Sequence, residues 1–170
     1  MEIRLEKICE SDVKQFKADM QEAFQKGFED NYGKTEGTIL PEKDIDLSMA
    51  EKGAVAYKAV IDGEMVGGAV VVINGETQHN DLHLLYVKYG IQMGGIGFAM
   101  WQAIEKLHHE TKVWETCTPY FERRNIHFYV NKCGFHIVEF RNEYNTPPEE
   151  REEDFIGDGG DGMFVLKKQM

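Results

Sequence analysis

The stretch Gln92-Met93-Gly94-Gly95-Ile96-Gly97 stands between a strand-like run over residues 82–89 and a helix-like run over residues 96–108. A glycine-rich turn that opens a helix points several main-chain N–H groups at one spot and adds the positive end of the helix dipole. Such a turn suits a phosphate or pyrophosphate group. A plain strand-to-helix turn without a ligand is the alternative interpretation.

Two common phosphate-binding patterns do not match this stretch. No lysine follows Gly97, so the Gly-Lys-Ser/Thr ending of a P-loop is missing. A dinucleotide fingerprint needs three glycines at a fixed spacing after a chain-opening strand, and that arrangement is missing too. The spacing Gln-x-x-Gly-x-Gly resembles instead the coenzyme A pyrophosphate loop of the GNAT N-acetyltransferases.

A second stretch, Asn125-Ile126-His127-Phe128-Tyr129-Val130-Asn131-Lys132-Cys133-Gly134-Phe135, strengthens this resemblance. It is similar to the GNAT signature in which a short helix carrying Asn and Tyr runs into a Gly-Phe pair that begins the next strand. Two motifs in the right order, on the expected elements, are more specific than either alone. The resemblance covers residues 54–140 and implies the GNAT acyl-CoA N-acyltransferase fold.

Length and composition indicate a single domain over residues 1–170, with a core that needs neither metal nor disulfides. The cysteines Cys9, Cys117 and Cys133 contain no close pair, which favours buried thiols. The histidines lack a metal-ligand spacing, so we expect no metal. The sequence has neither a run of about 18 apolar residues nor a signal-peptide pattern, which indicates a cytoplasmic protein without a membrane partner.

The formal net charge of −11 argues against a nucleic-acid partner, because binding phosphates needs a basic face. The excess of acid is either a solubility feature or a means of attracting a cationic amine. Part of it lies in the acidic run 149–154, which has the composition of a solvated loop.

Apolar periodicity predicts the order β-α-α-β-β-β-α-β-α-β-β, which mixes hairpins with βα crossovers. We therefore expect an α/β protein with a central mixed sheet of six to seven strands and about four flanking helices. Residues 27–41 read as a loop. One helical stripe of apolar residues before this loop is assigned to the core, and it consists of Val13, Phe16, Met20, Phe24 and Phe28.

The resemblance implies acetyl-CoA as the cofactor. The main chain of the strand before the glycine loop, at Leu85, Tyr86 and Val87, is expected to pair with the pantetheine arm as an added strand would. Asn125 is expected to reach the amides at the thiol end. The pyrophosphate is assigned to the loop residues Gln92, Met93, Gly94, Gly95, Ile96 and Gly97.

The activity implied is direct transfer of an acetyl group from acetyl-CoA to a primary amine of a small molecule or protein, without an acyl-enzyme. Such a reaction needs a base for the ammonium proton, donors for the developing oxyanion and an acid for the thiolate. Strand N–H groups near Tyr86 and Val87 are candidates for the oxyanion contact. Cys117 and Cys133 have no adjacent helix start or histidine, so we expect core thiols rather than nucleophiles.

The resemblance places the general-acid tyrosine four residues before the Gly of Gly-Phe, but Val130 occupies that position and Tyr129 precedes it. One residue rotates a helical side chain by about 100°. Tyr129 is therefore either the acid, on a distorted helix end, or a core residue.

His83 and Glu115 are the candidate bases, since both lie in strands whose ends meet where the sheet splays. Strict alternation places His83 on the same face as Leu85 and Val87. A base acting through water, and Glu115 as a ligand of the substrate ammonium, are the alternatives.

The amine is expected to contact residues 24–47 and the late loop 142–162. An acyl-CoA-binding sensor with this fold but without turnover is the alternative function. A binding protein of α+β class with an accidental glycine loop is the third. Because edge strands in this fold often pair between protomers, a homodimer is also possible.

Overall fold

A computed structural model describes residues 2–91, 93–145 and 162–170. Its elements follow the predicted order, with one additional short turn near the N-terminus. They are β1 (Arg4–Lys7), the 3-10 turn η1 (Glu10–Asp12), α1 (Val13–Tyr32), α2 (Glu42–Ala50), β2 (Ala54–Ile61), β3 (Glu64–Val72), β4 (His79–Val87), α3 (Ile96–Leu107), β5 (Val113–Pro119), α4 (Arg123–Ile126), the π-helical turn η2 (His127–Lys132), β6 (His136–Arg141) and β7 (Met163–Gln169).

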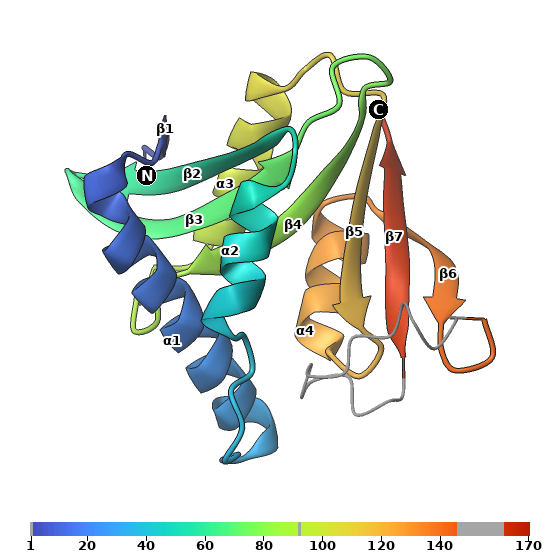
Figure 1. Cartoon of the computed structure of the whole chain (residues 1–170), viewed down its shortest axis with the longest axis horizontal. Coiled ribbons are helices and arrows are strands. Elements are labelled where there is room, and N and C mark those ends of the chain that lie inside the picture. The colour runs from blue at the N-terminus through green and yellow to red at the C-terminus, as the bar shows by residue number, and fades with distance from the viewer. Residues whose placement is uncertain (1, 92, 146–161) are drawn as a thin grey trace.

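The seven strands form one sheet in the order β1-β2-β3-β4-β5-β7-β6 (Figure 1). β4 and β5 run parallel, and every other neighbouring pair is antiparallel. The predicted mixed sheet is therefore confirmed. Helices α1 and α2 cover one face of β2–β4 and α3 covers the other (Figure 1).

The sheet splits between its two parallel strands. β4 pairs with β5 only from His79 to Asp81, and in Figure 1 the two strands diverge beyond that point. On the other side of β4, Val71 faces Leu82 while Val70 faces Leu84, so His83 is an extra residue that forms a β-bulge. A bulge bends its strand and increases the local twist. The bulge thus lies where β4 leaves β5.

Two groups of buried side chains hold the layers together. On the α3 face, Trp101 of α3 packs edge-on against Trp114 of β5, with ring centroids 5.2 Å apart. On the α1–α2 face, Phe16 of α1 packs edge-on against Tyr86 of β4 at 5.7 Å. Gly68 makes this second contact possible, because a Cβ there would lie 2.4 Å from a ring carbon of Phe16.

Helix α1 is longer than predicted, and its end replaces the start of the expected loop 27–41. Gly27 weakens a helix by about 1 kcal/mol relative to alanine, which is why the sequence indicated a break. Aromatic contacts of the helix end offset this cost: the rings of Phe28 and Tyr32 lie 6.3 and 5.5 Å from Phe121, before α4. Tertiary packing has overridden the local signal.

The prediction of buried cysteines is wrong at two of three positions. Cys133 is buried, but Cys9 and Cys117 are exposed. Cys117 is exposed because it lies on β5 beyond the split, where no neighbouring strand or helix of the described chain covers that face. All three cysteines are among the described residues, and none forms a disulfide.

Within the described ranges, no group of three or more His, Cys, Asp or Glu side chains is arranged to hold a metal ion. The helices of the described chain include none that is long and apolar enough to cross a membrane. The acidic run 149–154 lies outside the described residues.

Candidate active site

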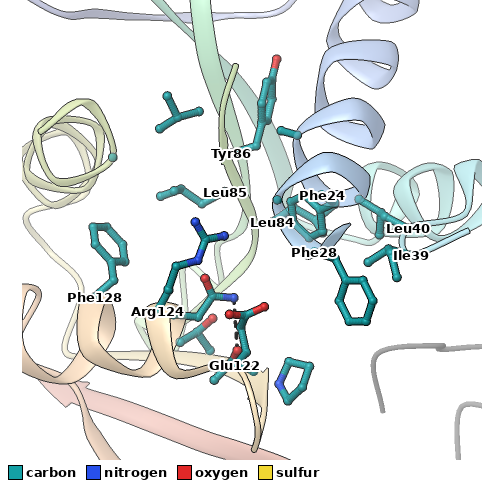
Figure 2. Close-up of a pocket in the computed structure, with 18 of the residues that line it drawn as sticks. Phe24, Phe28, Ile39, Leu40, Leu84, Leu85, Tyr86, Glu122, Arg124 and Phe128 are labelled. Carbon is teal, nitrogen blue, oxygen red and sulfur yellow. Dashed lines mark hydrogen bonds between the residues drawn. The ribbon is translucent and has the colours of Figure 1, made fainter. Parts of the chain in front are cut away.

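A cavity of about 1060 Å³ occupies the split between β4 and β5. Figure 2 shows how its walls are built: Arg124 and Phe128 reach in from one side, Phe24 and Phe28 of α1 from the other, with β4 between them. Because β4 borders the space with both faces, the cavity has one part on the α3 face and another on the α1–α2 face.

Of the described glycine-loop residues, Gly97 lines the cavity, on its α3 face. Gly95 is the N-cap of α3 and has a φ of 83°, a left-handed conformation that favours glycine. A Cβ at Gly97 would lie 3.6 Å from Phe128 and 3.7 Å from Val87, so this residue faces the gap between β4 and η2. Gly95 has no side chain that could cap the first N–H groups of α3. These groups are therefore available to an anion.

The other loop residues differ in what they offer. Gly94 and Met93 are exposed, with Met93 at 49 %. Ile96 is buried in the core, so only its main chain is available to a ligand. Gln92 lies outside the described residues.

The edge of β4 that faces the split is suited to an extended ligand. Beyond Asp81, no β5 residue of the described chain pairs with β4, and Thr116 Oγ1 instead donates to the carbonyl of Leu82 at 2.9 Å. Leu85 and Val87 line the cavity from the α3 face. Tyr86 points the opposite way and is buried under α1, where burial raises its pKa well above the ordinary value.

Asn125 lines the cavity from α4, as the sequence predicted for a ligand-contacting position. Its Nδ2 donates to Thr118 Oγ1 of β5 over 3.3 Å. This bond fixes the orientation of the amide beside β5, on one side of the split. The amide oxygen remains available to accept a further hydrogen bond.

Tyr129 reaches the cavity because the helix that carries it is distorted. The N–H of Cys133 donates to the carbonyl of Phe128 at 3.0 Å, which is the i to i−5 bond of a π-turn. A π-turn contains one residue more than an α-helical turn. In this chain Tyr129 lies one residue farther from Gly134 than the motif spacing requires, and Val130 occupies the motif position. Tyr129 is buried and also belongs to the core on the α3 face, so both predicted interpretations describe part of its position.

The hydroxyl of Tyr129 is held in its protonated form. Burial raises the pKa of Tyr129 strongly, and a hydrogen bond with the Thr116 side chain offsets only part of that shift. A buried neutral phenol is a hydrogen-bond donor. Because the Thr116 hydroxyl donates to Leu82, the phenol is the donor in its bond with Thr116, and its hydrogen must leave Thr116 to reach a ligand.

His83 faces α2, so the predicted placement on the same face as Leu85 and Val87 is wrong. The bulge at His83 interrupts the alternation of β4, a local feature that strand periodicity does not reveal. Its Nδ1 lies 3.3 Å from Ser48 Oγ and 3.6 Å from Glu51 Oε2 at the end of α2. The imidazole lines the cavity.

Glu115 lines the same part of the cavity beside a carboxylate that the sequence analysis missed. Asp81 is the register partner of Glu115 in the last β4–β5 pair, so both side chains project from the same face. Burial, followed by the charge of Glu115, raises the pKa of Asp81, while the charge of nearby His83 lowers it. Glu115 Oε1 also lies 3.5 Å from Lys167 Nζ of β7.

Other lining residues differ in how far the sequence indicated them. Phe24 and Phe28 were assigned to the core with the rest of the α1 stripe, and they also begin the range 24–47 that was expected to contact the amine. The stripe runs out of the core and into the cavity. Arg124 and Lys88 bring positive charge to the open end of the split. The guanidinium of Arg124 lies close to α1. A Cβ added at Gly27 of α1 would be 3.3 Å from it.

Comparison with known proteins identifies this arrangement. The sequence profile described as the Acetyltransferase (GNAT) family matches residues 17–135. The chain belongs to the GNAT family. This GNAT acetyltransferase is 50 % identical over 145 residues to the uncharacterized protein YrkN of Bacillus subtilis (strain 168), covering 85 % of this chain and 78 % of the relative.

Solved structures share the fold of this GNAT protein at low sequence identity. An IAA acetyltransferase from Bacillus cereus superposes with a TM-score of 0.69 at 17 % identity, over 99 % of this chain and 100 % of the other. A Bacillus subtilis acetyltransferase in complex with CoA gives 0.68 at 21 % identity, over 99 % of each chain. The PaiA N-acetyltransferase from Thermoplasma acidophilum, also in complex with CoA, gives 0.68 at 15 %, over all of both chains.

Proposed function

We propose that this GNAT protein transfers the acetyl group of acetyl-CoA to a primary amine by direct attack. The observation that carries the proposal is the split between β4 and β5: it ends at the open N-terminus of α3 and is lined by the predicted Tyr129, His83 and Glu115. A single cavity thus combines an anion site, an unpaired strand edge and groups for proton transfer.

The residues of the α3 face fit acetyl-CoA. The N-terminus of α3 at Gly95 suits the pyrophosphate, and the edge of β4 at Leu85 and Val87 suits the pantetheine amides. Asn125 adds an amide oxygen. When bound, acetyl-CoA supplies a thioester whose acetyl carbon is open to attack by a neutral amine.

His83 is the base in this proposal. With a proton on Nδ1 directed toward Ser48 or Glu51, the lone pair of Nε2 is available to take a proton from the substrate ammonium. Glu51 then acts as a positioning residue that selects this tautomer. Glu115 attracts the ammonium before it is deprotonated.

Tyr129 is the acid in this proposal. As the amine nitrogen bonds to the acetyl carbon and the carbon–sulfur bond breaks, the phenol hydrogen is directed at the leaving sulfur. Main-chain N–H groups of the β4 edge donate to the acetyl oxygen. The products are an acetamide and the free thiol of CoA, with the ammonium proton on His83. The second proton of the attacking nitrogen is lost as the amide forms, and it restores the Tyr129 phenol.

We do not propose the alternative of a non-catalytic acyl-CoA sensor. That hypothesis rested on the displacement of Tyr129 from the motif position. The π-turn offsets this displacement, and the tyrosine lines the cavity.

Thermal unfolding with and without millimolar acetyl-CoA tests the cofactor site. A ligand at about 100 times its dissociation constant adds about 2.7 kcal/mol of stability, which corresponds to a rise of several degrees. Gly94→Glu places a negative charge in the glycine loop. A Cβ at this position would meet open space, with no atom beyond the chain neighbours within 4 Å, so the fold tolerates the substitution.

The matched control is Gly75→Glu, at an exposed turn that has equal room. We expect the acetyl-CoA shift to persist in this control and to vanish in Gly94→Glu. The absence of a shift in the native chain contradicts the proposal. A screen of primary amines for release of the CoA thiol then tests turnover, with Tyr129→Phe as the variant expected to be slow.

A further inference from the structure

The part of the cavity on the α1–α2 face is separate from the part that fits acetyl-CoA. It is enclosed by α1, the segment between α1 and α2, α2 itself and the outward faces of β4 and β5. If acetyl-CoA binds as proposed above, this space holds the acceptor amine. Its lining therefore describes the acceptor, and the inference below rests on the proposed function.

The wall of this space is apolar. Ile39 and Leu40 are 5 % and 4 % exposed, so they are fixed parts of the wall. Leu47 is 68 % exposed although it is a large apolar side chain, and it stands at the mouth. Figure 2 shows several of these side chains together; the full apolar set is Phe24, Phe28, Ile39, Leu40, Leu47 and Leu84.

The floor of this space is acidic. Asp81 and Glu115 project side by side from the last β4–β5 pair. Glu51 lies beside His83 at the end of α2. Lys167 faces these three carboxylates from β7, where it pairs with Glu115 over 3.5 Å and remains half exposed. The negative charge thus exceeds the positive charge at the point where the amine must react, which suits an ammonium group.

The charges at the floor make a carboxylate beside the amine unfavourable. Such a group would face Asp81 and Glu115 and would lose its hydration against the apolar wall. Further charged residues line the cavity away from the floor, and they are Asp30 on α1, Asp44 on α2, Lys88 after β4, and Glu122 and Arg124 at the start of α4. These groups place no restriction on a second charge at the far end of the acceptor.

We propose that the acceptor is a primary amine on an apolar body, an alkyl or arylalkyl chain, with no carboxylate beside the amine. The body lies against the wall formed by α1, α2 and Leu84, and the ammonium lies between Asp81 and Glu115 until His83 takes its proton. Burial and then Glu115 raise the pKa of Asp81, and the charges of His83 and Lys167 offset that shift only in part.

Matched pairs of amines test this proposal. Hexylamine against butylamine measures the contribution of two methylenes, and phenylethylamine against phenylalanine adds a carboxylate beside the amine. Burying a methylene is worth about fourfold in affinity, so we expect kcat/KM for hexylamine to exceed that for butylamine by about fifteenfold. We expect phenylalanine to be a poorer substrate than phenylethylamine by at least tenfold.

Two variants with matched controls locate the effect. Leu47→Ser is expected to reduce the hexylamine-to-butylamine ratio, whereas Leu107→Ser, at a similarly exposed leucine on α3, is expected to leave it unchanged. Glu115→Gln is expected to raise KM for the amine but not for acetyl-CoA, and Glu64→Gln on the distant hairpin is the control. Calorimetric titration of each of these amines into the complex with CoA measures their affinities without turnover. We expect the affinities to follow the same order as kcat/KM.

The outcomes separate this inference from the proposed function. A preference for phenylalanine over phenylethylamine, or for butylamine over hexylamine, overturns the inference while leaving the acetyltransferase proposal intact. A thermal shift with acetyl-CoA but acetylation of none of these amines also overturns it. If acetyl-CoA does not raise the thermal unfolding temperature and no amine releases the CoA thiol, the results contradict the proposed function itself.

Discussion

The two faces of the split sheet offer a ligand different kinds of contact. On the α3 face, the cavity presents main-chain groups, the glycines of the loop and small polar side chains such as Thr118 and Asn125. On the α1–α2 face, it presents carboxylates, an imidazole and large apolar side chains from four elements. Main-chain contacts change little with sequence, whereas side-chain contacts change with every substitution. The first face therefore suits a cofactor common to the family and the second an acceptor particular to this chain.

The largest expected effect is on the α1–α2 face, where His83→Ala removes the proposed base. General-base catalysis contributes about 10²- to 10⁴-fold, so we expect kcat to fall by that factor at neutral pH. The thermal shift produced by acetyl-CoA should remain, because His83 belongs to the other face. Steady-state kinetics and thermal unfolding check the two halves of this prediction.

A fall of less than tenfold would mean that a water molecule or another side chain acts as the base. A loss of the acetyl-CoA shift would contradict the division of the cavity into two faces. Glu51→Gln provides the finer test: if it positions His83, it should shift the pH profile of kcat while KM for acetyl-CoA stays constant.

The second prediction compares two thiols on opposite sides of the fold. Burial raises the pKa of Cys133 to about 12, so at pH 8 about one thiol in 10,000 is ionised there. Cys117 is exposed and lines the cavity. We expect iodoacetamide to alkylate Cys117 at least a hundredfold faster than Cys133, as followed by peptide mass spectrometry.

Protection sharpens this comparison. Hexylamine together with CoA should slow the alkylation of Cys117, while exposed Cys9, remote from the cavity, should react at an unchanged rate. Equal protection of Cys9 and Cys117 would mean that the ligands act through general stabilisation rather than by filling the cavity.

The third prediction concerns the packing that positions the α1–α2 face. Gly68→Ala places a Cβ 2.4 Å from the ring of Phe16 and 2.8 Å from the carbonyl oxygen of Tyr57. Overpacking of this kind costs about 1–3 kcal/mol, so we expect the free energy of unfolding in urea to fall by that amount. Gly75→Ala is the control, since no atom beyond its chain neighbours lies within 4 Å of the added carbon. Equal effects of the two substitutions would show that α1 adjusts its position freely.

The smallest expected effect is a change in the pH dependence of stability. Because burial and Glu115 raise the pKa of Asp81, the folded protein binds its proton more tightly than the unfolded chain does. The free energy of unfolding therefore decreases as the pH rises above 3.8, the ordinary pKa of an aspartate, because the folded protein loses the proton that it binds more tightly.

Asp81→Asn removes this titration. We expect the variant to gain stability relative to the native chain as the pH rises from about 4 to 6, measured by urea unfolding at a series of pH values. A difference that stays constant over this range would show that Asp81 is well solvated or already paired.

The sequence predicted the α3 face better than the α1–α2 face, and the reason is physical. The glycine loop and the Asn-to-Gly-Phe stretch are each contiguous, so a short motif carries most of their geometry. Asp81 and Glu115 become partners only through the β4–β5 register, across more than thirty intervening residues. No local pattern indicates such a pair.

Single-residue irregularities explain the other differences. The bulge at His83 turns the imidazole to the face opposite that given by alternation, and the π-turn after Phe128 brings Tyr129 to the cavity despite the motif spacing. Neither has a propensity signal, because each is set by the packing of its element on the rest of the fold. The order of helices and strands along the chain and the hairpin at Asp62-Gly63 were predictable because regular apolar periods and a turn dipeptide mark them.

The hydroxyl of Tyr32, near the end of α1, donates to the carbonyl of Phe121 at 3.1 Å and lies 3.3 Å from a carboxylate oxygen of Glu122. It joins the half of the molecule built on β1–β4 to the half built on β5–β7 at the end remote from their shared ladder. The β4–β5 ladder closes the split at one end, and this hydrogen bond bridges its two sides at the other. A ligand that spreads the two halves apart must therefore break the bond of Tyr32.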